Sequence, residues 1–182
     1  MSVKLCLEET VNIVCGYAPQ VGCEVEEKEK FWRELEEEVS LIPLGERVIF
    51  GADLNGHVGR ERGVLERIHG GWGVGERNEE GEKILDFALS FDLAICNTFF
   101  QKNSQYVTYK SGGRESQIDF LMCRRRDLKE VRNCKVIYGE HVSAQHKVVV
   151  MDWEFRAVKK RKPERGAPKI KWWRLKDEHL KR

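Results

Sequence analysis

The apolar residues of this chain come in short runs, and this pattern limits the folds that it can adopt. Runs rich in β-branched and aromatic residues, each bounded by charged, Gly or Pro residues, predict strands. They lie at residues 11–18, 47–52, 93–97, 106–110, 117–123, 131–138 and 147–155. No run reaches the roughly eighteen apolar residues of a membrane helix, and residues 1–10 lack the order of a secretory signal. We therefore expect a soluble intracellular protein without a membrane partner.

Two segments have the periodicity of amphipathic helices instead. Apolar residues recur three and four positions apart in residues 24–40 and again in residues 78–90, where Asn78 is a plausible cap. Pro43 and Gly45 end the first helix. The strands and helices do not alternate in a regular βαβ order, so the sequence predicts an α+β fold in which helices cover sheets.

The remaining features of the chain give weaker expectations. Residues 59–75 are rich in glycine and charge, which predicts a long exposed loop in which the glycines only mark turns. The six cysteines have neither the Cys-x-x-Cys spacing nor the neighbouring His of a zinc site, and we expect most to be reduced, buried thiols.

Charge divides the chain into two parts. Residues 156–182 hold twelve Lys or Arg against three Asp or Glu, a net charge of +9, so the total of +2 leaves −7 for residues 1–155. We expect one domain over 1–155 and a basic tail over 156–182. The basic run Lys159, Lys160, Arg161 and Lys162 suggests non-specific DNA binding or a nuclear localisation signal. A solvated tail without a partner is the alternative.

Four polar residues stand where strands end or begin. Asp53 and Asn55 directly follow the run 47–52, where a strand end would bring both side chains into a cleft. Asp119 lies inside an apolar strand, where a charge needs a partner, and His146 begins another strand. An Asp–His pair fixes the tautomer of the histidine. Taken singly, each residue is as well explained by a turn or by a structural role.

Together these residues belong to four motifs whose order is more specific than any one of them. The motifs are GYAP (16–19), GADLN (51–55), QIDFLM (117–122) and SAQHKVVV (143–150). This order resembles the endonuclease/exonuclease/phosphatase superfamily. The stretch GADLNGHVG and the terminal KIKWWRLKD are similar to RTE-type retrotransposon endonucleases and to the craniofacial development protein 2 family.

The resemblance implies a DNase I-like fold, a two-sheet β-sandwich flanked by helices, with Mg²⁺ in a cleft formed by strand-end loops. In that fold Tyr17 would contact the scissile phosphate and Asp53 would orient or deprotonate the attacking water. Asn55 would hydrogen-bond the phosphate, while Asp119 would pair with His146 to stabilise charge on the non-bridging oxygens. In such retroelements the terminal segment leads to a reverse transcriptase module.

Two departures from the family pattern shape the expectations for this chain. The chain begins just before the strand of Tyr17, so the resemblance implies a fold incomplete at the amino terminus and a metal site without its main ligand. Gln145 stands where an Asp is common, and a neutral amide is a weaker ligand for a hard dication. We expect slow DNA cleavage or none, and an uncovered apolar patch that includes Val11, Ile13, Ile49 and Phe50.

The functional hypothesis is Mg²⁺-dependent hydrolysis of DNA phosphodiesters by a retroelement-derived, endonuclease-like domain. Two alternatives remain open at this point. One is a catalytically silent domain that binds nucleic acid or protein, and the other is a gene fragment without function of its own. The superfamily also includes phosphatases of lipids and sugars, which share the same motifs.

Overall fold

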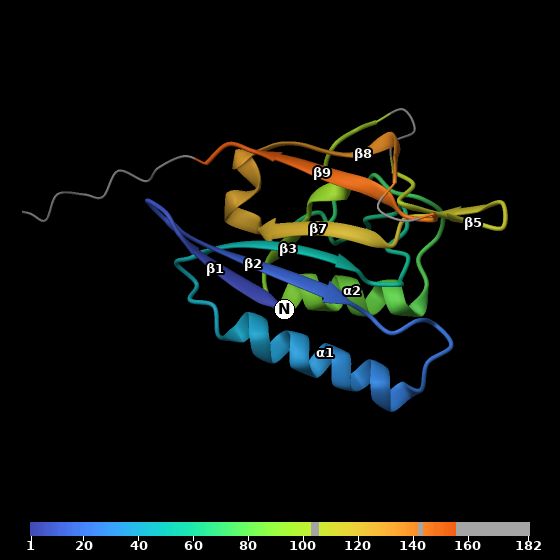
Figure 1. The fold of residues 1–182 in the computed structure, drawn as a ribbon, viewed down its shortest axis with the longest axis horizontal. Helices are drawn as coiled ribbons and strands as arrows, with labels where there is room; N and C mark the ends of the chain where they lie inside the picture. The colour runs from blue at the N-terminus through green and yellow to red at the C-terminus, as the bar shows by residue number, and fades with distance from the viewer. Residues whose placement is uncertain (103–105, 142–143, 156–182) are drawn as a thin grey trace, which may run out of the picture.

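The computed structural model describes residues 1–102, 106–141 and 144–155, and it centres on one five-stranded sheet (Figure 1). The strand order is β1-β2-β3-β7-β4; β2 and β3 run parallel, and each other neighbouring pair is antiparallel. The strands are β1 (Ser2–Cys6), β2 (Thr10–Tyr17), β3 (Arg47–Asp53), β4 (Leu93–Ile95) and β7 (Asp119–Arg124).

A second layer and a helix layer cover the two faces of this sheet. The antiparallel pair β8 (Val131–His141) and β9 (Lys147–Trp153) lies over β7, and α1 (Val25–Ser40) and α2 (Glu79–Ser90) cover the other face (Figure 1). The short elements are the β5 (Tyr109–Ser111) and β6 (Arg114–Ser116) hairpin, η1 (Cys96–Thr98) and η2 (Arg125–Glu130). The predicted α+β class, with two sheets flanked by helices, is confirmed.

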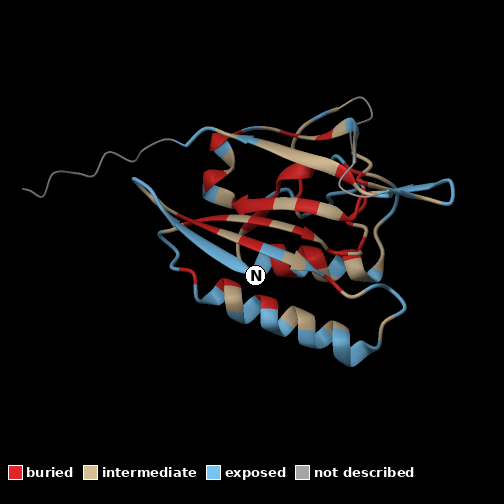
Figure 2. Cartoon of the chain, in the orientation of Figure 1, coloured by how far each residue is buried: buried red, intermediate tan, exposed pale blue. Residues whose placement is uncertain are grey.

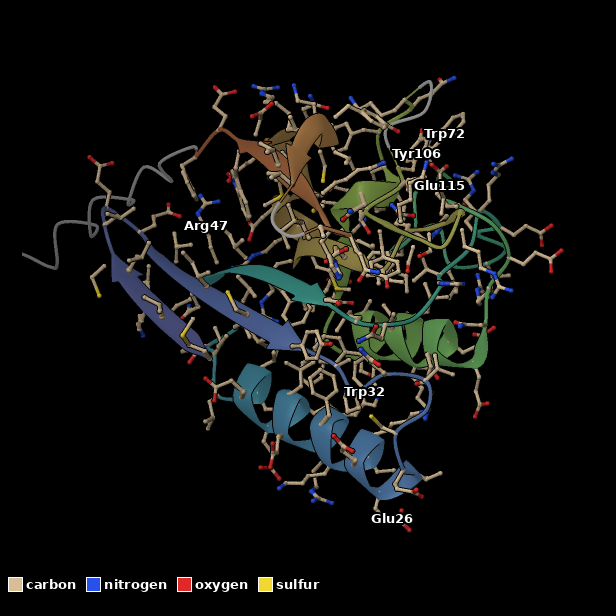
Figure 3. The ribbon with its side chains drawn as sticks, turned by 45° about the vertical axis from the view of Figure 1, so that its right-hand side comes forward. Glu26, Trp32, Arg47, Trp72, Tyr106 and Glu115 are labelled. Carbon is tan, nitrogen blue, oxygen red and sulfur yellow. The ribbon has the colours of Figure 1, made fainter. Side chains whose placement is uncertain are left out.

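The main core lies between the five-stranded sheet and the helices. Alternate residues of β3, among them Phe50, point into this layer, where the Phe50 ring lies 5.7 Å from that of Phe87 on α2. Trp32 on α1 packs on the same Phe87 ring at 5.6 Å and faces the sheet in Figure 3. Figure 2 shows the buried residues concentrated between these layers. The helix at 78–90 begins as expected, because the Asn78 side chain accepts the Gly81 N–H at 2.9 Å.

A buried ion network joins the β1–β2 turn, β3, η2 and β9 at the end of the sheet where β3 begins. Arg47 is 4% exposed and donates hydrogen bonds to Glu9, at 2.7 Å, and to Glu130. Glu130 also accepts the Trp153 indole N–H at 3.0 Å, and the guanidinium lies over the Phe155 ring, 5.7 Å from its centroid. The guanidinium thus gives ion-pair partners to carboxylates that would be costly to bury alone.

The loop at 59–75 is exposed over much of its length, as expected, but one part of it is buried and its glycines do more than mark turns. Ile68 and His69 are fully buried there, and burial lowers the pKa of His69 to about 4. Gly70 and Gly73 are more than turn markers, because a Cβ on either would lie 2.3 Å from a carbonyl oxygen. The loop folds back onto η1 and can do so only where the backbone approaches this closely.

Three smaller expectations also need correction. The strand at 11–18 does not open the fold, because β1 precedes it and pairs with it as a hairpin. Strand β6 follows a tight Gly112–Gly113 turn and has no apolar signal of its own. Half of the cysteines rather than most are buried: Cys96, Cys123 and Cys134 are buried, Cys6 and Cys15 are exposed, and Cys23 is intermediate.

An apolar stripe is uncovered on the face of the sheet that β8 and β9 cover only in part. Val3 and Leu5 of β1 are 47% and 39% exposed, and Cys15 of β2 is exposed on the same face. The residues expected in this patch were partly wrong. Phe50 points into the helix layer and Val11 lies opposite Arg47, so both are buried.

We predict that this stripe binds hydrophobic dye and promotes self-association. The double variant Val3→Thr, Leu5→Thr keeps β-branched residues in the edge strand but removes apolar surface. Dye fluorescence and the associated fraction in sedimentation should both fall. Val64→Thr is the control, because Val64 is 95% exposed in a loop outside the stripe. Equal dye binding by wild type and the double variant would contradict the prediction.

Candidate functional site

Three adjacent strands bring three of the predicted residues into one row. Tyr17 at the end of β2 is the register partner of Asp53 at the end of β3, and Asp53 is in turn opposite Asp119, where β7 begins. Register partners project to the same face of a sheet. The row therefore places a phenol and two carboxylates side by side at one edge.

His146 completes this group from the overlying layer, immediately before β9. Its Nδ1 lies 3.2 Å from both carboxylate oxygens of Asp119, within hydrogen-bond distance. Its Nε2 lies 3.8 Å from Asp53 Oδ2. The Asp119–His146 pair, which the family resemblance implied, is thus present in the structure with the geometry that orients an imidazole.

The Asp53 carboxylate is more buried than that of Asp119: the Asp53 side chain is 11% exposed and the Asp119 side chain 21%. Burial raises the pKa of Asp53, the Asn55 N–H hydrogen bond at 3.1 Å lowers it, and the nearby Asp119 raises it further. The net pKa lies above the ordinary value. Asp53 is therefore a better proton acceptor than a solvated aspartate.

The ring of His146 is also held from the side by the segment that leads into β5. Tyr109 forms an isolated antiparallel bridge with His146, and the two rings meet edge to face with centroids 4.8 Å apart. Gln145 fastens this arrangement, because its side chain accepts the Tyr109 hydroxyl at 3.3 Å and donates to Ser111 at 2.8 Å. Its amide faces the hairpin, so its role as a metal ligand stays a prediction.

Two further predicted residues lie next to the group. The Asn55 side chain donates to the Ala18 carbonyl at 2.8 Å, and the backbone at Asn55 has a positive φ of 48°. This contact ties the end of β3 to the end of β2. The ring of Tyr17 is 62% exposed at the rim, and its hydroxyl accepts a hydrogen bond from Gln20 at 3.4 Å. A phosphate contact by either residue stays a prediction.

The row opens into a cleft of about 400 Å³ between β2, β3, β7 and β9. Tyr17, Asp53, Asp119 and His146 line it at the strand ends, and Leu121 and Val149 line its apolar part. Gly51 leaves room beside Leu121 in the lining of the cleft, because a Cβ at this position would lie 3.2 Å from the Leu121 side chain. Polar groups at the edge of a part-apolar cavity are typical of ligand sites.

The same three side chains could hold a cation. One ligand atom from each of Asp53, Asp119 and His146 lies within 4.8 Å of the others. Two carboxylates suit a hard divalent cation such as Mg²⁺, and a cation would offset the repulsion and burial that raise the pKa of Asp53.

Sequence reasoning did not identify three residues that shape the site. Asn97 and Thr108 hydrogen-bond the backbone around Asp119, and Tyr109 packs on His146. Asn97 and Thr108 could have been identified as small polar residues inside otherwise apolar segments, because a buried polar group needs a hydrogen-bond partner.

We predict that Asp53→Asn stabilises the fold at neutral pH. Because the pKa of Asp53 is raised in the folded state, its ionisation lowers stability as pH rises through that pKa. The amide keeps the acceptor for Asn55, so the melting temperature at pH 7 should rise by about 2–4 °C. The gain should vanish below about pH 4, where the carboxyl is protonated in both states. Asp86→Asn, at an exposed position of α2, is the control; an equal rise there, or a rise independent of pH, would contradict the prediction.

No helix of the described residues is long and apolar enough to cross a membrane. No protein-family model matches the chain. In sequence it is 27% identical over 149 residues to craniofacial development protein 2 of Tragulus javanicus and 28% identical to that of Bos taurus. These alignments cover 80% of this chain and 26% and 25% of the relatives, so the chain spans about a quarter of their length.

Solved structures with a similar fold include nucleases. The endonuclease domain of TRAS1, a telomere-specific non-LTR retrotransposon, gives a TM-score of 0.57 at 17% identity, covering 85% of this chain and 63% of that one. The AP endonuclease from Archaeoglobus fulgidus gives 0.59 at 10% identity and covers 80% and 62%. The Xenopus laevis APE2 catalytic domain gives 0.55 at 19% identity and covers 84% and 52%. The chain thus shares the fold of these structures, and in sequence it is similar to craniofacial development protein 2.

Proposed function

We propose that this chain is a retroelement-derived domain that hydrolyses phosphodiester bonds of DNA with the help of Mg²⁺. The observation that carries the proposal is the Asp119–His146 hydrogen bond beside Asp53 in an open cleft. The structural neighbours include an AP endonuclease, the endonuclease domain of a retrotransposon and a 3' phosphatase bound to a DNA hairpin, and these support DNA as the substrate class.

Each residue of the site would have a separate role in hydrolysis, which follows from its position. Asp53 lies part-buried at the edge of the cleft beside His146, where its carboxylate can orient a water molecule and accept its proton. Asp119 fixes the His146 ring through Nδ1 and thereby sets the direction of Nε2, which lies on the Asp53 side of the ring. A donor at that place would stabilise charge that builds on a phosphate oxygen during attack. Tyr17 at the rim would contact the phosphate.

Magnesium would be held by the carboxylates of Asp53 and Asp119. When bound, it would act as a Lewis acid on the phosphate oxygens. The basic segment 156–182, outside the described residues, belongs to the proposal as a non-specific phosphate contact, because its net charge of +9 favours counterion release from DNA.

We predict Mg²⁺-dependent nicking of supercoiled plasmid by the purified chain and at least about a hundredfold loss in His146→Ala, as removal of a transition-state donor usually gives. His57→Ala is a matched histidine control outside the cleft and should nick at the wild-type rate. Chelation of Mg²⁺ should abolish nicking.

The same assay separates the proposal from its rivals. Nicking that is equal in wild type and His146→Ala would show a contaminating nuclease or another site. Absence of nicking with retained, salt-dependent DNA binding would favour a silent binding domain, and absence of both would remove the proposal.

A further inference from the structure

Thr108 lies between the two backbone segments that carry Asp119 and His146. It is fully buried. Its hydroxyl oxygen accepts two backbone N–H groups, from Ile118 at 3.0 Å and from Asp119 at 3.1 Å. Buried backbone N–H groups need an acceptor, and the Thr108 hydroxyl serves as the acceptor that a neighbouring strand would otherwise supply to Ile118 and Asp119.

The N–H of Thr108 donates to the Ser116 carbonyl at 2.9 Å, on the Asp119 side, whereas its carbonyl bonds toward the segment of His146. Its carbonyl accepts the Lys147 N–H at 2.8 Å, and the Lys110 N–H donates to Gln145 at 2.9 Å. These two bonds flank His146, which lies opposite Tyr109 in the bridge. One residue therefore connects the backbone of Asp119 to the backbone next to His146, at the end of the molecule where β5, β7 and β9 meet (Figure 1).

Asn97 holds Asp119 from the other side. The Asn97 amide donates to the Asp119 carbonyl at 3.1 Å and accepts the Leu121 N–H at 2.7 Å. The β4–β7 ladder reaches only to Ile95, opposite Met122, before η1 turns away. The Asn97 side chain continues the pairing for one more step, so the backbone of Asp119 is fixed on both sides.

We propose that Thr108 is a positioning residue that sets the distance between Asp119 and His146, with Asn97 as the opposing anchor. This inference rests on the proposed function for its catalytic consequence, but the hydrogen bond that it concerns can be measured without catalysis. Thr108 and Asn97 do not line the cleft, so they act only through the residues that do.

The variant Thr108→Val tests the hydroxyl with little change of shape. It leaves the Ile118 and Asp119 N–H groups buried without this acceptor, which favours a shift of the strand. A displacement of about 1 Å at a reacting group can lower turnover strongly. We expect kcat to fall at least about tenfold with KM within about twofold, because substrate contacts at the rim are unchanged.

Two further variants separate positioning from general stability. Thr108→Ser keeps the oxygen and should restore kcat to within about threefold of wild type. Thr98→Val is the matched control: Thr98 is equally buried, accepts the Gly70 N–H at 2.9 Å and donates to Ile95 at 2.7 Å. It should lose thermal stability like Thr108→Val and keep the wild-type kcat.

A spectroscopic readout makes the test independent of activity. The proton on His146 Nδ1, held by Asp119, should give a downfield NMR signal that is assigned by its loss in His146→Gln. That signal should broaden or disappear in Thr108→Val and Asn97→Ala but persist in Thr108→Ser and Thr98→Val. A signal and a kcat that respond alike to Thr108→Val and Thr98→Val would overturn the inference. If wild type is inactive, the proposed function fails, and the signal alone still decides the positioning role.

Discussion

The register between β2, β3 and β7 is the constraint on which the site depends. It places Tyr17, Asp53 and Asp119 in one row, and a slip of one residue in any of these strands would turn a side chain to the helix layer. The buried alternate residues of the same strands hold the register. Phe50 and Phe120 pack in the core between sheet and helices, so moving them outward would expose large apolar surface.

The electrostatic environment differs between the two ends of the sheet. At the opposite end of the sheet, Arg47 forms ion pairs with the acids around it. At the site edge, Asp53 and Asp119 lie beside a histidine, and burial raises the pKa of Asp53. Among the described residues, the first arrangement uses acids to stabilise the fold. The second keeps a part-buried carboxylate next to an open cleft, as catalytic and binding sites commonly do.

The sequence predicted the features that arise from local pattern. The helix at 78–90 with its Asn78 cap followed from periodicity and capping chemistry, and Asp119 inside an apolar strand indicated a partner, which is His146. Features that depend on tertiary contacts could not be read in this way. The compact loop around His69 has a polar, glycine-rich sequence, and its burial comes from close backbone packing against η1.

The supports of the site were also beyond sequence reasoning, for the same physical reason. Thr108 and Asn97 each bond backbone groups ten or more residues away, and such partners are set by the fold rather than by neighbouring residues. The four motifs span the region from β2 to β9. Their order was therefore enough to predict the fold, although no protein-family model matches the chain.

A double-mutant cycle on cleavage tests the central claim, that Asp119 and His146 act as one unit. The rates of Asp119→Asn, His146→Gln and the combined variant would be measured under single-turnover conditions. If the hydrogen bond between them is what makes His146 effective, the combined variant should be about as slow as the slower single variant. Losses that multiply would show that the two residues act independently and would contradict the account.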